Sequence, residues 1–198
     1  MEHSVFATTD VLRLQALSQL RWELLLGLPR LVEIVEWELR PSARRDRALG
    51  FALSAWAQSC AQPFPLDEHV RRSRTLAEAA RRVDPLGHLA MALHRAIARR
   101  LETESGPVSS AHRANLDAAC RRYVETRNRL ILRGREVVDD VLDQLSVDEH
   151  RRGDAFQNGV FGLMRSFEMF DGTRHRSFDR LVRRQIEAAQ TEFASVAA

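Results

Sequence analysis

The chain has 198 residues, of which 44% are hydrophobic, and a formal net charge of +3. This is enough for a hydrophobic core in one domain, or in one domain with a large extension. The mild positive charge, carried by arginine alone since the chain has no lysine, permits nucleic-acid contact without requiring it. Cys60 and Cys120 match no metal or disulfide spacing, and no apolar run reaches 18 residues, so we expect a cytoplasmic protein without a membrane span.

The hydrophobic residues of the first half recur with helical periodicity, and no stretch alternates as a strand does. We therefore expect helices throughout the first half. Asp10 and Asp67 are the expected caps of the first and fourth helices, and Pro41 is expected to end the second. The second helix carries Leu31, Ile34, Val35 and Trp37 on its apolar positions. The expected helices cover about 10–26, 30–40, 42–60, 66–83 and 86–104.

The second half is also predicted to be helical. A long helix begins at Ser109 or Ser110 and reaches about Leu145, a loop follows at 148–153, and a last helix begins near Ser177. The turn at Gly106 and Pro107 predicts a division into a helical bundle at 1–106, of unknown role, and a second domain at 107–198.

Residues 154–171, DAFQNGVFGLMRSFEMFD, form the most informative segment. At about 100° per residue, one stripe of this predicted helix is apolar and is expected to face the core. It consists of Phe156, Val160, Leu163, Phe167 and Phe170. The opposite face carries Asp154, Gln157, Phe161, Met164, Arg165 and Glu168. Phe161 and Met164 either pack against another helix of the same domain or form a small docking patch with a polar rim.

The same segment resembles the core-binding helix of bacterial RNA polymerase sigma factors of the sigma-70 family. The pattern is matched without a gap by Asp154, Gln157, Gly159, Gly162, Leu163, Met164, Phe170 and Asp171. The resemblance implies that three helices of residues 109–193 form a sigma region 2 core within the domain at 107–198, docked on the coiled coil of the polymerase clamp. The implied polymerase-binding residues are Asp154, Gln157, Asn158, Phe161 and Met164. Asn158 stands where the family has a glutamate, so one charge for pairing is lost.

The resemblance extends over about 119–193, weakly at Val124, Glu125, Arg129 and Leu130 and moderately at Phe178, Ile186 and Thr191. The family's aromatic residues that capture unpaired promoter bases are replaced by Arg176, Leu181, Arg184 and Gln185, and its base-reading glutamine by Ala188. Candidate DNA-binding residues are Arg176, Arg180, Arg183, Arg184 and Thr191. The arginines suit phosphate contacts, or form a solvated face paired with Asp179, Glu187 and Glu192.

The expected function is that of a sigma-like protein acting in transcription initiation or its regulation. Core RNA polymerase is the expected partner, with promoter DNA and a second sigma-like or anti-sigma protein as further candidates. A partner is expected to supply promoter recognition, because no second DNA-reading domain follows the match. The alternative is a helical interaction or nucleic-acid-binding module unrelated to polymerase. No catalytic motif, metal-ligand spacing or phosphate-binding glycine loop is present in the sequence, so neither an enzyme nor a cofactor is expected.

Overall fold

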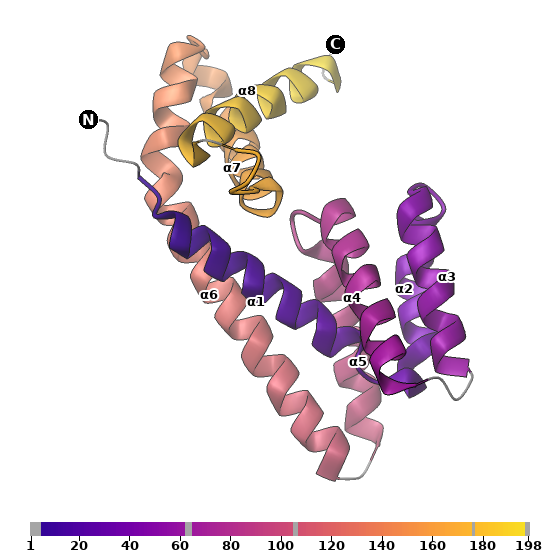
Figure 1. Ribbon diagram of the computed structural model, residues 1–198. Coiled ribbons are helices and arrows are strands. Elements are labelled where there is room, and N and C mark those ends of the chain that lie inside the picture. The colour runs from indigo at the N-terminus through magenta and orange to yellow at the C-terminus, as the bar shows by residue number, and fades with distance from the viewer. Residues whose placement is uncertain (1–4, 62–64, 105–106, 176, 197–198) are drawn as a thin grey trace. The chain divides into compact units, whose positions relative to one another are not determined.

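The computed structural model describes residues 5–61, 65–104, 107–175 and 177–196, and this part of the chain is all-helical with no strand (Figure 1). The all-α fold class is therefore confirmed. The α-helices are α1 (Thr8–Leu26), α2 (Val32–Ala43), α3 (Arg47–Ala61), α4 (Leu66–Val83), α5 (His88–Thr103), α6 (Pro107–Gln144), α7 (Arg152–Met169) and α8 (Phe178–Val196). Short 3-10 helices, η1 (Pro29–Leu31) and η2 (Glu149–Arg151), lead into α2 and α7.

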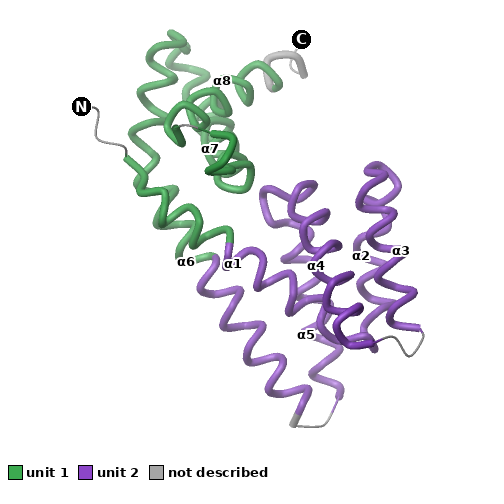
Figure 2. The backbone as a smooth tube through the Cα atoms, viewed as in Figure 1, with its two compact units in different colours: residues 1–15, 124–198 green, residues 16–123 purple. Residues whose placement is uncertain are grey.

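The chain forms two compact units (Figure 2). Unit 1 combines residues 1–15 with residues 124–198, and unit 2 consists of residues 16–123. The division predicted at 106/107 differs from these units, because α1 and α6 each contribute residues to both.

Unit 2 has one hydrophobic core, to which α1 to α6 all contribute. Trp22 and Trp56 are fully buried in it, surrounded mainly by leucines and alanines. Trp37 lies outside this core with 73% of its surface exposed, so the apolar stripe of α2 does not include it. Tyr123, at the end of the unit, is buried under the guanidinium of Arg21, whose Cζ lies 4.0 Å from the ring centroid.

Several helix boundaries differ from the predicted ones for local reasons. Pro41 lies inside α2, which continues because the backbone N–H of Arg44 still bonds to the carbonyl of Arg40. The cap of α3 is Asp46, whose carboxylate accepts from the N–H of Leu49 at 2.7 Å, so this helix begins later than predicted. Asp10 lies within α1 rather than at its start, and α4 covers the predicted range without a side-chain cap.

Unit 1 is built from α7 and α8, the C-terminal part of α6 and the first residues of the chain. Its interior holds an aromatic cluster of Phe6, Phe167, Phe170 and Phe178, with ring centroids 5.1–5.8 Å apart. Gly134 of α6 leaves the space that this cluster fills, because an added Cβ would lie 2.7 Å from Cζ of Phe6. Phe6, near the start of the chain, is therefore part of the core of unit 1.

Candidate docking face on α7

The buried side of α7 is rotated from the predicted apolar stripe toward small residues. Phe156 and Val160 are only half-buried, although the stripe placed them in the core. The buried residues of α7 are Ala155, Asn158, Gly159, Gly162, Leu163, Met164, Ser166 and Phe167. The rotation follows from close packing against α8, which large side chains on this face would prevent.

Gly162 is the point of closest approach between α7 and α8. A Cβ at this residue would lie 2.5 Å from the carbonyl oxygen of Gln185 and 2.7 Å from Cα of Ile186. At Gly159 a Cβ would lie 2.5 Å from Cγ1 of Val138 in α6. Two glycines one turn apart thus seat α7 against two helices, and they fix which face of α7 stays outside.

The exposed face of α7 carries three of the five predicted polymerase-binding residues. Asp154 and Gln157 are exposed, and Phe161 keeps 43% of its surface accessible. Because these residues are spaced three and four apart, they lie on one side of the helix. Arg165 and Glu168 border them, and Arg165 is tied to Glu192 of α8 by a 2.7 Å ion pair. We define Asp154, Gln157 and Phe161 as the docking face.

Asn158 and Met164 were predicted on the accessible face, and that placement is wrong. Asn158 is 7% exposed and Met164 is 9% exposed. Both flank the docking face and point inward, because the buried arc of α7 is wider than its apolar stripe. Nδ2 of Asn158 has no hydrogen-bond partner among the described residues, so the buried amide contributes less to stability than a satisfied one would.

Of the four arginines predicted on one face of α8, two are exposed without an ion-pair partner in the described structure. Arg180 and Arg184 are exposed, and within the described part of the chain neither has an ion-pair partner. Arg183 is half-buried, and its Nη2 lies 3.8 Å from the carboxylate of Asp140. Arg176 lies outside the described residues. Thr191 is exposed, and its hydroxyl donates to the carbonyl of Glu187 at 3.1 Å.

The positions where the family carries base-capturing aromatics differ in accessibility. Leu181 is only 3% exposed, so its side chain belongs to the core of unit 1. Gln185 is half-buried, and Arg184 is exposed. At these three positions the described surface offers no aromatic ring on which an unpaired base could stack.

Sequence patterns did not identify two residues that shape this site. Phe6 is 2% exposed among the rings of unit 1, and the side-chain amide of Gln15 donates to the carbonyls of both Phe167 and Phe170 at 2.8 Å. Both residues are more than 150 positions from their partners in sequence. Only long-range contacts connect them, so no local motif could have revealed the pairing.

Unit 2 contains a buried polar pair, Ser59 and His69. Ser59 donates to the carbonyl of Trp56 at 2.6 Å, so the 2.9 Å contact between Ser59 and His69 has Nδ1 of the histidine as donor. Nε2 of His69 is buried without a partner among the described residues, and burial lowers the pKa of this imidazole. Because its hydroxyl proton is committed to a carbonyl, Ser59 is not arranged as a nucleophile.

The described residues contain no cluster of three or more histidine, cysteine, aspartate or glutamate side chains placed to hold a metal ion. In the same part of the chain, no helix combines the length and apolar character needed to cross a membrane. Comparison with protein-family models, with curated proteins and with solved structures gives no match for this chain.

Proposed function

We propose that this protein is sigma-like and binds core RNA polymerase through the docking face of α7. The observation that carries the proposal is the exposure of Phe161, with Asp154 and Gln157 on the same side of a helix that is otherwise seated in its domain. A large aromatic side chain inside a polar rim is the usual composition of an interaction hot spot. The resemblance of residues 154–171 to the core-binding helix supports the polymerase clamp as the proposed partner.

The burial of Asn158 and Met164 changes how the interface would work. The contact surface consists of three residues instead of the five predicted. Phe161 supplies most of its apolar area. Asp154 supplies the only carboxylate among the three residues of the docking face, so we expect a weak salt dependence of polymerase binding. The protein would act in initiation or its regulation, with a partner supplying promoter recognition.

The test is a titration of purified core polymerase with the full chain and single variants. Phe161→Ala should weaken binding by about thirty-fold, which corresponds to an anchor loss of about 2 kcal/mol. Gln157→Ala should weaken it less, because it removes a polar rim contact. Phe51→Ala is the matched control, since Phe51 is an exposed phenylalanine on a helix of unit 2. If the Phe161 variant binds as tightly as the Phe51 variant, the docking face is not the interface.

A second candidate function, contact with nucleic-acid phosphates, is favoured by Arg180 and Arg184. Arg184 lies three positions and Arg180 seven positions from Glu187, and no ion pair from either guanidinium to Glu187 is formed in the described structure. Two available arginines support salt-sensitive contact with little sequence preference. This activity is compatible with the first proposal, and it is tested separately by DNA retention in the absence of polymerase.

A further inference from the structure

The C-terminus of α7 lacks an end signal of its own. Its last residue is followed by Phe170 in an extended conformation, with φ −63° and ψ 125°, and not by a glycine in the left-handed region. The last carbonyls of a helix have no partner inside the helix, and they need one elsewhere. The N–H of Phe170 still bonds to the carbonyl of Ser166, so the carbonyls that follow Ser166 are the ones that need partners from elsewhere.

Gln15 of α1 is such a partner. Its side-chain Nε2 lies 2.8 Å from the carbonyl oxygen of Phe167 and 2.8 Å from that of Phe170. One amide group therefore holds the final turn of α7 and the first residue beyond it. Both carbonyls belong to residues whose rings lie in the aromatic cluster, so backbone and side chains are held at the same place.

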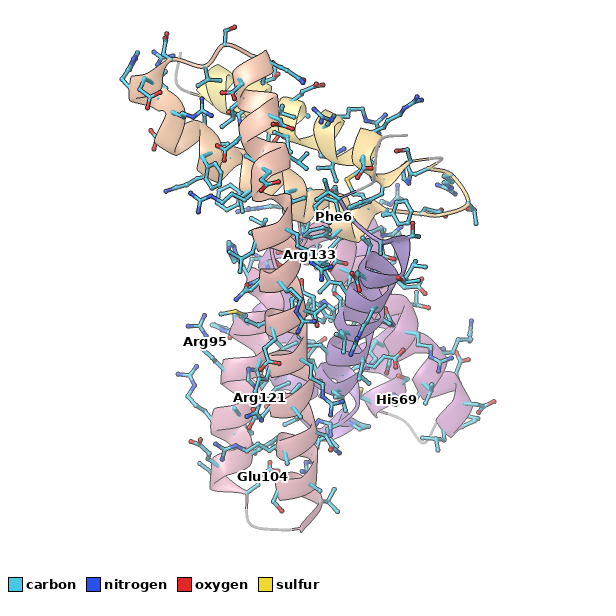
Figure 3. The ribbon with its side chains drawn as sticks, turned by 90° about the vertical axis from the view of Figure 1, so that its left-hand side faces the viewer. Phe6, His69, Arg95, Glu104, Arg121 and Arg133 are labelled. Carbon is cyan, nitrogen blue, oxygen red and sulfur yellow. The ribbon has the colours of Figure 1, made fainter. Side chains whose placement is uncertain are left out.

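Phe6 fixes the other side of the same turn. Its ring lies edge-on to Phe167 before the turn, at 5.8 Å, and to Phe178 after it, at 5.2 Å. The segment between Phe6 and Gln15 is also anchored to α6, because Asp10 forms a 2.8 Å ion pair with Arg133. Phe6 and Arg133 are labelled in Figure 3. Gly134, the next residue of α6, leaves room for the Phe6 ring.

We infer that residues 5–15, the N-terminal segment, position the turn between α7 and α8. Phe6 packs edge-on against the stacked rings of Phe167 and Phe178, and Gln15 caps α7. The turn has internal hydrogen bonds as well, including 2.9 Å from the N–H of Asp171 to Nδ1 of His175. These bonds close a small loop, and the N–H of Phe170 still bonds to the carbonyl of Ser166 at 3.0 Å. The carbonyls of Phe167 and Phe170 are left for a partner outside the turn. The N-terminal segment supplies that partner through Gln15.

If the proposed function holds, the N-terminal segment also affects how the two candidate surfaces are presented. The docking face precedes the turn, and Arg180 and Arg184 follow it. A segment that holds the turn therefore adds to the contact at Gly162 in setting the direction of α7 relative to α8 within unit 1. A looser turn should reduce the ability of the protein to present the docking face and the arginines of α8 together, although the residues of both surfaces are unchanged.

The experiment compares amide hydrogen exchange in the full chain and in Gln15→Met, which keeps side-chain size but removes both donated bonds. Exchange at Phe170, Asp171 and His175 should accelerate by about five- to thirty-fold, as expected for losing one or two hydrogen bonds. Gln15→Lys should restore protection, because an ammonium can donate to both carbonyls. Gln19→Met is the control, since Gln19 lies one turn along α1 and bonds only to side chains of unit 2.

Unchanged exchange at the turn in Gln15→Met would overturn the inference, as would equal acceleration throughout α6, α7 and α8, which would indicate a general loss of stability. Polymerase titration of the same variants then separates the two proposals. If the turn loosens in Gln15→Met and the parent protein binds no polymerase, the positioning role stands and the proposed function fails. If both hold, Gln15→Met should bind polymerase several-fold more weakly than Gln19→Met.

Discussion

Replacement of Gly162 by alanine tests whether the backbones of α7 and α8 are in contact. The added methyl group would lie 2.5 Å from the carbonyl oxygen of Gln185, about 1 Å short of ordinary van der Waals contact. The obstacle is backbone, and a rotamer change cannot remove it. Helix α8 would have to move away from α7, and its buried residues, including Ile186 and Val182, would lose contacts with it.

The expected cost follows from two opposing effects. Overpacking of a close-packed site costs about 1–3 kcal/mol, whereas glycine to alanine within a helix gains about 0.5–1 kcal/mol. We therefore expect Gly162→Ala to lower the free energy of unfolding of unit 1 by about 1–2 kcal/mol. Gly159→Ala should cost less, because the atom in its way is Cγ1 of Val138, a side-chain methyl group that can move.

Gly153→Ala is the control in the same helix. A Cβ at Gly153 would have no heavy atom within 4 Å, so only the helical preference of alanine acts, and stability should be equal to the parent or higher by about 0.5 kcal/mol. Urea unfolding followed by circular dichroism gives the three midpoints. The urea midpoint should be highest for Gly153→Ala, lower for Gly159→Ala and lowest for Gly162→Ala. A Gly162→Ala protein as stable as Gly153→Ala would refute the close packing of α7 against α8.

Three further outcomes are expected. Stability should fall as the pH drops through about 6.5 toward the lower folded-state pKa of His69, because the unfolded imidazole binds protons there and the buried one does not. His69→Asn keeps a donor for Ser59 and cannot titrate, so it should reduce this acid sensitivity in urea midpoints measured between pH 7.5 and 5.5. DNA retention should show a log–log salt slope of about −2, reduced in magnitude by about 0.9 in either Arg180→Ala or Arg184→Ala; a slope unaffected by both would exclude α8. Permanganate footprinting with polymerase and this protein alone should show no reactive thymines, since Leu181 is buried where a base would stack; reactive thymines near a start site would contradict this.

The sequence allowed the helices to be predicted because the period of hydrophobic residues reports directly on helical structure. Residues 66–83 of α4 are an example, since proline on each side limits the helix. Pro41 misled the prediction because a proline near the end of a helix costs one hydrogen bond without ending it when the next turns still pair.

The candidate site was predictable only in part. An apolar stripe identifies large side chains, and it misses a face that is buried because its residues are small. Gly159, Gly162 and Ser166 carry little hydrophobicity, yet they form the side of α7 that packs most closely. Met164 was placed on the accessible face for this reason, and Asn158 was placed there because the resemblance implies it as a polymerase-binding residue. The contribution of Gln15 depends on a partner 152 positions away, and no local pattern encodes it.

Because unit 1 consists of residues 1–15 and 124–198, unit 2 is an insertion within it along the chain. During synthesis the ribosome completes unit 2 first, and this unit has its own core. The first residues of the chain, including Phe6, emerge earliest but acquire their partners in α7 and α8 last. Until then an apolar segment lacks its core, and the final step of folding must close a connection of more than a hundred residues. A folded unit 2 lowers the entropic cost of closing this connection, because it replaces a flexible chain with a compact one.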